Sequence, residues 1–235
     1  MNILAIGCHP DDLEIGCGGT LARYAQEGHR VVMCHIANGN MGHKVIAPDE
    51  LAVIRHKEAQ DAAKLLGAEI LSMGVNDLFV NNQNEDDIRR LVDVIRYAKP
   101  DVIITHDPDD YMRDHVQASE MVFNASFSAS ITHYQTQHDC LDTIPPIYFM
   151  DTLAGMGFIP TEYVDISKTI DLKLQALQCH DSQIRWMREH DGIDFLNFMR
   201  TCSKYRGLQC NVAYAEGFKP CIRWPRMAST RLLPA

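Results

Sequence analysis

The sequence predicts an α/β fold, with a mostly parallel β-sheet flanked by helices and a C-terminal helical and β elaboration. Two observations favour this class. Short apolar runs of strand length alternate with segments of helical periodicity over the first half of the chain, as in right-handed β-α-β units whose sheet is covered on both faces. The 235 residues, 46 % hydrophobic and 23 % charged, are also enough to bury a full-sized core.

The elements follow one another in a regular order. We expect strands over 2–8, 31–37, 70–75 and 101–106, and helices near 17–27, 48–66, 86–98 and 115–129. Pro48 lies in the first turn of the second helix, apolar residues recur in it at helical spacing, and Gly67 ends it. Farther on, we expect a β-like run over 147–153, helices near 170–190 and 193–205, and no clear element over 220–235. Without repeats or linkers, the chain is predicted to form one domain over 1–235, with its core in 1–130 and the elaboration in 131–235.

Charge and composition exclude several classes of partner. The 22 Lys and Arg against 31 Asp and Glu give a net charge of −9, which would repel a nucleic acid backbone. No apolar run approaches the roughly 20 residues that span a bilayer, and no basic segment precedes the short apolar stretch at the N-terminus. We therefore expect a cytoplasmic protein that binds neither nucleic acid nor a membrane.

The 8 cysteines include no C-x-x-C pair, so neither a thiolate zinc site nor a disulfide framework is predicted. Cys8 and Cys34 lie in apolar runs and are interpreted as small buried hydrophobic residues. A catalytic thiol at Cys8 is the alternative. Because neighbouring strand residues point to opposite faces, we expect that His9 does not serve it as a base.

Polar side chains gather at the ends of two predicted strands. The first strand ends in the run His9-Pro10-Asp11-Asp12-Leu13-Glu14, and the fourth leads into an acidic run from His106 to His115. Ligands of an open parallel sheet bind beyond the carboxyl ends of its strands, and strands one and four are neighbours in a common doubly wound order. We therefore expect the two clusters to meet.

The composition of these clusters favours a metal ion. Packed carboxylates repel one another, and a bound cation relieves that repulsion. Imidazole together with carboxylate favours zinc over calcium, which prefers oxygen ligands alone. Each cluster by itself is also typical of an acidic loop that caps a helix, with Asp114 as the N-cap. Capping does not explain why both loops carry histidines, so a catalytic metal site is predicted.

A nucleotide site is the competing interpretation. The segment Gly16-Cys17-Gly18-Gly19 follows the first strand as a phosphate-binding turn would, but the G-x-G-x-x-G spacing fails at Leu21. Asp11, Asp12 and Glu14 would repel a pyrophosphate, and the second strand ends without the acidic residue that holds a ribose. The glycines are therefore interpreted as close-packing positions where the first helix meets the sheet.

Ordered motifs extend along most of the chain. They are His9-Pro10-Asp11-Asp12, Gly18-Gly19, Asn38-Gly39 with Gly42, Arg55-x-x-Glu58, Leu66-Gly67, Asp114-His115, His180-x-Ser182-Gln183 and Tyr214-Ala215-Glu216. Together they resemble the PIG-L/LmbE family of zinc-dependent N-deacetylases. The resemblance implies a Rossmann-like fold, one Zn²⁺ per chain, a homo-oligomer (trimer or hexamer), and removal of an acetyl group from an N-acetylglucosamine unit in a small glycoside, glycolipid or aminoglycoside-type precursor.

The resemblance also implies roles for single residues. His9, Asp12 and His115 match the family's zinc ligands, and Asp11 matches its general base. Asp11 would take a proton from a water on the zinc and return it to the leaving amine.

Three further residues are expected to support this chemistry. Arg55 matches a position that the family uses near the sugar, and the alternative for it is a solvated helix residue. His180 is expected to bind substrate or to lie beside the metal. Asp114, which precedes a predicted ligand, is expected to orient the site.

One position departs from the family pattern. The family's usual His-Pro-Asp-His motif reads Met112-Arg113-Asp114-His115 here, so the histidine that helps to stabilise the tetrahedral intermediate is missing. Methionine is no useful hydrogen-bond donor. We expect Tyr111 or Arg113 to take this role.

Two alternatives to the deacetylase function are kept. One is an amidase that acts on a larger amino-sugar conjugate with the same metal site, and the other is a catalytically weak sugar-binding protein.

Overall fold

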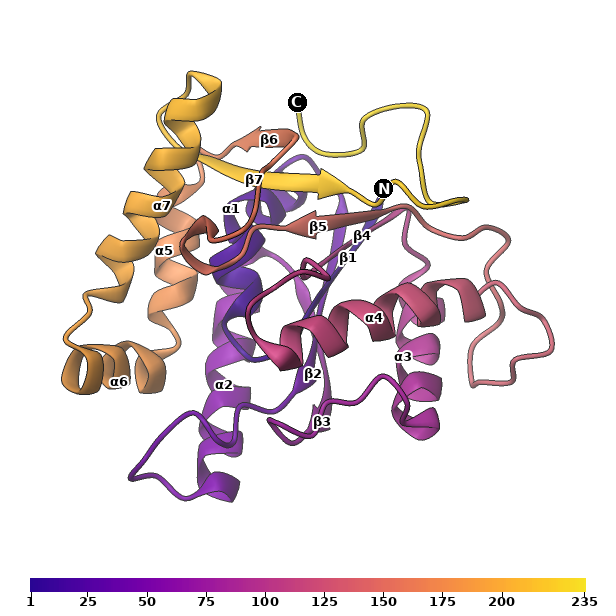
Figure 1. The fold of residues 1–235 in the computed structure, drawn as a ribbon, viewed down its shortest axis with the longest axis horizontal. Helices are drawn as coiled ribbons and strands as arrows, with labels where there is room; N and C mark the ends of the chain where they lie inside the picture. Colours follow the sequence, from indigo (N-terminus) through magenta and orange to yellow (C-terminus); the bar gives the residue numbers. More distant parts are fainter.

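A seven-stranded β-sheet forms the centre of the structure, a computed structural model that describes residues 1–235 (Figure 1). The strands are β1 (Asn2–Gly7), β2 (Arg30–Ala37), β3 (Glu69–Val75), β4 (Val102–Thr105), β5 (Ile147–Met150), β6 (Glu162–Asp165) and β7 (Ala215–Pro220). The helices are α1 (Asp12–Gln26), α2 (Pro48–Leu66), α3 (Glu85–Ala98), α4 (Arg113–Ser128), α5 (Ile170–Gln178), α6 (Asp181–Asp191) and α7 (Phe195–Cys210), with a short 3-10 helix at Leu153–Gly155. The predicted α/β class is confirmed.

The strand order places the ends of β1 and β4 side by side. The order is β3-β2-β1-β4-β5-β7-β6, in which β1 to β5 are parallel and β7 runs antiparallel to both of its neighbours. Ile6 of β1 pairs with Thr105 at the end of β4, and Gly7 pairs with His35 near the end of β2. The predicted adjacency of strands one and four is therefore confirmed, and the loops that follow them leave the sheet at the same edge.

Helices cover both faces of the sheet, and each face has its own core. Ile3 and Ala5 of β1 point into a core of 27 buried residues that α1, α2, α5 and α7 close. Leu4 and Ile6 point to the opposite face of the sheet, into a core of 21 buried residues under α3 and α4. This alternation along one strand is the geometry of a sheet buried on both sides. None of the helices combines the length and the apolar character needed to cross a membrane.

The structure differs from the predictions at α1, at the helix expected over 170–190, and at the strands β6 and β7. Helix α1 begins at Asp12 rather than near Cys17, because the backbone of Asp11 turns the chain directly from β1 into the helix. The helix expected over 170–190 is two helices, which break at Cys179 and His180. The strands β6 and β7 were missed, since β6 has only four residues and β7 contains Gly217 and Pro220, which are unfavourable in strands.

Candidate metal centre

The turn between β1 and α1 presents several polar side chains within a few residues. Asp11 has a φ of 112°, a left-handed conformation that residues other than glycine rarely adopt and that concentrates at functional sites. The Asp12 Oδ2 atom accepts the backbone N–H of His9 at 2.6 Å and closes the turn. Asp12 is also the first residue of α1, where the helix dipole favours a negative charge.

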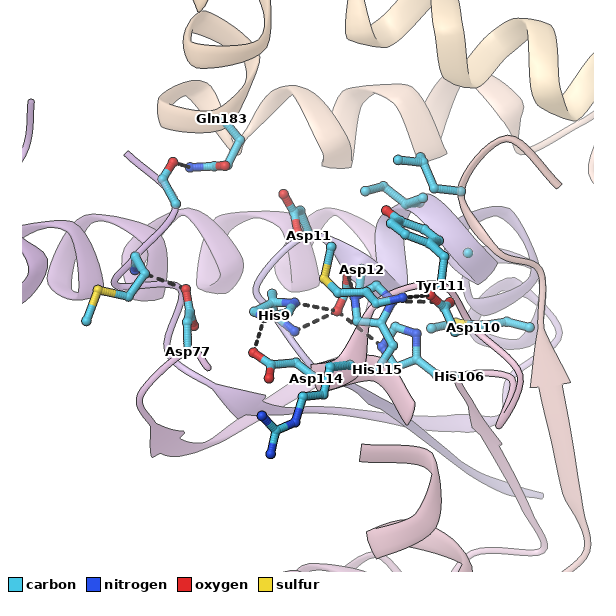
Figure 2. Close-up of a pocket in the computed structure, with 18 of the residues that line it drawn as sticks. His9, Asp11, Asp12, Asp77, His106, Asp110, Tyr111, Asp114, His115 and Gln183 are labelled. Atoms are coloured by element: carbon cyan, nitrogen blue, oxygen red, sulfur yellow. Dashed lines mark hydrogen bonds and ion pairs between the residues drawn. The ribbon is translucent and has the colours of Figure 1, made fainter. Parts of the chain in front are cut away.

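The Asp12 carboxylate lies at the centre of three imidazoles (Figure 2). Its Oδ2 atom is 3.4 Å from His9 Nδ1 and 3.1 Å from His106 Nε2, and its Oδ1 atom is 3.3 Å from His115 Nε2. Burial disfavours a charge on Asp12, but His115 and His106 outweigh it and hold the pKa of this carboxyl well below its usual range. Asp12 is therefore a buried anion that three imidazole rings surround.

Two further aspartates lie behind the histidines. The Asp114 Oδ2 atom is 3.3 Å from His9 Nε2, and the Asp110 Oδ2 atom is 3.2 Å from His115 Nδ1. Each carboxylate engages one ring nitrogen and leaves the other nitrogen facing Asp12, which is how metal-binding histidines are commonly oriented. Burial disfavours a charge on His115, yet Asp12 and Asp110 raise its pKa to about 9.

The donors fit a borderline divalent cation. Ligand atoms of the predicted set, His9, Asp12 and His115, all lie within 4.8 Å of one another. Both ring nitrogens of His115 are buried, and their contacts with Asp12 and Asp110 lack the geometry of a hydrogen bond, as expected where one of these nitrogens is a ligand to an ion. Two overlapping groups of the same kind share its members: one contains His106, Asp110 and His115, the other Cys8, His9 and Asp114. Two imidazoles and one carboxylate are a donor set typical of catalytic zinc.

A cavity of about 520 Å³ opens beside this cluster. One side carries the cluster itself together with Asp11, Tyr111 and Arg113. A second part of the lining is mostly apolar and comes from α1, β5, the segment after β5, α6 and α7, with Asp151 and Gln183 as its polar members. All the predicted site residues except His180 line this cavity.

Arg55 is buried and holds the turn that carries Asp11. Its Nη1 atom donates to the Gly39 carbonyl at 3.2 Å, and its Nη2 atom donates to the Pro10 carbonyl and lies 3.2 Å from Asp11 Oδ2. Burial raises the pKa of Asp11 to about 6, and Arg55 opposes this rise. The interpretation of Arg55 as a solvated helix residue is therefore wrong, because the guanidinium is needed inside the site.

His180 lies behind the cavity rather than on its surface. It is fully buried, and its Nε2 atom is 3.4 Å from Oε1 of Glu14, which is fully buried as well. The rest of its motif fixes α6: Glu58 accepts the backbone N–H and the hydroxyl of Ser182, each at 2.7 Å, and Gln183 Nε2 donates to the Gly42 carbonyl at 3.4 Å. These contacts cap a new helix and explain why the chain breaks at His180.

The sequence was also compared with known proteins. The family model described as PIG-L, GlcNAc-PI de-N-acetylase, matches residues 4–126, a range that contains every residue of the metal cluster. The chain belongs to the PIG-L family. The resemblance predicted from the motifs is confirmed.

Curated relatives of this PIG-L protein include enzymes of two reaction types. The uncharacterized deacetylase YaiS of Escherichia coli is 31 % identical over 189 residues, which cover 77 % of this chain and 90 % of YaiS. The diacetylchitobiose deacetylase of Thermococcus kodakarensis is 28 % identical over 230 residues, 92 % of this chain and 82 % of that enzyme. The 4-oxalmesaconate hydratase of Pseudomonas putida is 24 % identical, and the match covers 92 % of this chain and 87 % of that enzyme.

Solved structures agree with the PIG-L assignment. The N,N'-diacetylchitobiose deacetylase of Pyrococcus horikoshii, crystallised with an inhibitor, has a TM-score of 0.80 and 26 % identity, and the match covers 93 % of this chain and 83 % of that one. The 4-carboxy-2-hydroxymuconate hydratase GalB of Pseudomonas putida has a TM-score of 0.83 and 23 % identity, and the match covers 98 % of this chain and 100 % of that one. The two proteins share the fold.

Two interpretations from the sequence are wrong. Asp114 is not the N-cap of α4, because that position is Met112 and the Asp114 carboxylate turns instead to His9 and to the backbone N–H of Leu78 at 2.7 Å. The Cys8 Sγ atom does lie near His9 Nε2, at 3.8 Å, because β1 ends at Gly7 and strand alternation no longer applies. Burial raises the pKa of Cys8 to about 11, so its thiol stays protonated at neutral pH.

The structure adds functional residues that the sequence reasoning did not assign. Asp110 lies in the acidic run after β4 and had no role predicted from the sequence, and its carboxylate contacts His115. His106 directly follows β4 and contacts Asp12. Asp77 accepts the backbone N–H groups of Gly39 and Met41 at 2.8 and 3.0 Å and so fixes a loop beside the cavity. Asp77 follows β3, so the strand-end rule that found the other clusters applies to it as well.

Proposed function

We propose that this chain is a zinc-dependent hydrolase that removes an N-acetyl group from a small molecule containing N-acetylglucosamine. Glycosides, glycolipids and aminoglycoside-type precursors are the substrate classes that we consider. One observation carries the proposal: His9, Asp12 and His115 converge in a buried cluster, with Asp11 beside them on the wall of a cavity. The deacetylases among the relatives support the same reaction.

His9, Asp12 and His115 would hold one zinc ion per chain. When bound, zinc lowers the pKa of a water molecule towards roughly 7 and polarises a carbonyl group. The protein's part is to orient both imidazoles towards the ion. Asp114 and Asp110 serve that purpose, since each engages the ring nitrogen that faces away from Asp12.

Asp11 is the proposed general base. Burial raises the pKa of Asp11 to about 6, with Arg55 opposing the rise, so at neutral pH the carboxylate is ionised and still basic enough to accept a proton. The contact with Arg55 keeps this carboxylate at the cavity wall. Asp11 takes a proton from the attacking water and returns it to the nitrogen of the leaving amine.

Tyr111 and Arg113 are the proposed donors to the developing oxyanion, in place of the histidine that Met112 replaces. Both line the cavity, and the Tyr111 ring meets the His115 ring edge-on, with centroids 6.3 Å apart. Each side chain carries an N–H or O–H donor.

We also propose a cytoplasmic homo-oligomer. Large apolar side chains are exposed on α7, at Tyr205 and Leu208, and in the C-terminal tail, at Ile222 and Trp224, as expected of a subunit contact. All eight cysteines are free, which suits a reducing compartment.

Acetate release from a panel of N-acetylglucosaminides tests the proposed function. Zinc-loaded protein should release acetate and free amine in equal amounts. Asp11→Asn should retain zinc and lose about 10²- to 10⁴-fold in kcat, because the base is removed and the ligands are kept. His133→Ala, at an exposed histidine that does not line the cavity, is the matched control and should keep full activity.

Two results would contradict the proposal. Sugar binding without acetate release would indicate a binding protein. Hydration of an unsaturated dicarboxylate, again without acetate release, would place the chain with the hydratases of its family.

A further inference from the structure

The cavity has an apolar wall that the proposed chemistry does not use. Its members come from five separate elements, and they are Ile15, Met150, Leu153, Met187 and Phe195. Met41 and Met112 line the same cavity, so four methionines meet in it. Methionine is flexible and polarisable, and surfaces rich in it accommodate apolar groups of varied shape.

The rim of the cavity is also apolar. The side chains of Leu78 and Tyr111 line the cavity and are 70 % and 59 % exposed. Leu78 has a φ of 69°, a left-handed conformation that is strained for a residue other than glycine. Its N–H donates to Asp114, so the metal cluster itself holds this leucine at the rim.

Charged groups near the apolar wall are already paired. Asp151 accepts two hydrogen bonds from Arg206, at 2.6 and 3.0 Å. Arg55 is engaged by Asp11 and by two backbone carbonyls. Arg113 has no ion-pair partner, but it is the first residue of α4 and directly precedes Asp114 of the metal cluster. The wall therefore offers no free charge to a phosphate, a carboxylate or an amine.

We propose that the substrate carries an apolar substituent, alkyl or aryl, which binds this wall while the acyl amide faces the metal cluster. This inference rests on the proposed function and narrows its substrate class. The volume of about 520 Å³ lies in the range of sites for ligands larger than a single sugar. An alkyl or aryl aglycone and a longer N-acyl chain share this chemistry.

Steady-state kinetics on matched substrates test the inference and separate the two sources. Methyl N-acetyl-β-glucosaminide is compared with the hexyl glycoside, which extends the aglycone, and with methyl N-hexanoyl-β-glucosaminide, which extends the acyl chain. At least one extended substrate should have a kcat/KM about tenfold or more above that of the methyl N-acetyl compound. The substrate that gains identifies which group binds the wall.

Variants then locate the effect. Met187→Gln, nearly equal in size but polar, should lower the preference for the extended substrate about tenfold, and Met187→Leu should retain it. Met227→Gln, at an exposed methionine in the C-terminal tail, should change nothing. Equal kcat/KM for all three substrates, or a preference that survives Met187→Gln, would overturn this inference and leave the proposed function intact. No hydrolysis of any of the three would overturn both.

Discussion

At the scale of single residues, protons and a metal ion compete for the same atoms around Asp12. Four aspartates (Asp11, Asp12, Asp110 and Asp114) and three histidines share this small buried volume. In the metal-free protein the pKa of His9 is raised well above its usual range, because its contacts with the Asp114 and Asp12 carboxylates outweigh its burial. The pKa of His115 is raised as well, by Asp12 and Asp110. A divalent cation can replace those protons and satisfy the same carboxylates.

Tyr111 and Arg113 provide a test at this scale. If one of them replaces the missing histidine, Tyr111→Phe or Arg113→Ala should lower kcat by about 10²- to 10³-fold, because an oxyanion donor is lost. Zinc content should stay unchanged, since neither is a proposed ligand. Full activity in both variants would show that the assignment is wrong. Tyr205→Phe, on the exposed side of α7, is the control and should have normal kinetics.

At the scale of elements, the far end of the chain fixes the helix that begins with Asp12. The Glu216 carboxylate of β7 accepts the N–H groups of Gly19 and Thr20 in α1, at 2.9 and 2.7 Å, and pairs with Lys173 of α5 at 2.6 Å. Lys173 in turn donates to the Ile15 carbonyl at 2.8 Å. The Tyr214-Ala215-Glu216 motif therefore supports the metal centre by holding α1, without contacting the centre.

Two neighbouring glycines of α1 test this packing. A Cβ atom on Gly19 would lie 2.8 Å from side-chain carbons of Ile166, whereas one on Gly18 would make only ordinary contact with Lys173 at 3.4 Å. Gly19→Ala should therefore cost about 1–3 kcal/mol of stability. Gly18→Ala should be neutral or stabilising by up to about 1 kcal/mol, because alanine is the better helix former. Urea unfolding gives the free energy of unfolding of both variants. Equal values for Gly18→Ala and Gly19→Ala would contradict the packing of α1 against Ile166.

At the scale of the whole molecule, the sequence was informative where chemistry and periodicity agree. Apolar runs predict the parallel strands, and the rule that ligands bind at strand ends predicts that the clusters of His9 and His115 meet. The apolar pattern of the sequence did not predict β6 and β7, which lie at one side of the sheet. Pairing stabilises them, since β7 pairs with both β5 and β6. The ion pair of Glu14 and His180 joins residues 166 positions apart, and no local pattern predicts such a contact.

The buried region around Glu14 and His180 makes the stability of the whole fold depend on pH. His35 is fully buried beside this pair, and burial lowers its pKa to about 4, with Glu14 opposing and His180 reinforcing the shift. As the pH falls below about 6.5, His35 of the unfolded chain takes up a proton, whereas His35 of the folded chain stays neutral until the pH approaches 4. The stability gained from neutral His35 is therefore complete above about pH 6.5 and falls by up to about 3 kcal/mol as the pH approaches 4.

Chemical denaturation at several pH values checks this effect. Between pH 7.5 and 4.5, wild-type protein should lose more unfolding free energy than His35→Gln, whose side chain does not titrate. The metal cluster is common to both proteins, so its own pH dependence cancels in the difference. Identical losses in the two proteins would exclude His35 as the source.

We propose that a single metal ion, held by His9, Asp12 and His115, makes this chain a deacetylase. Titrating metal-free protein with zinc while recording acetate release from an N-acetylglucosaminide tests it most directly. Activity should rise linearly and reach a plateau at one zinc per chain, and His115→Ala should show no such rise. Full acetate release by the metal-free protein, or zinc binding that saturates without any release of acetate, would contradict the claim.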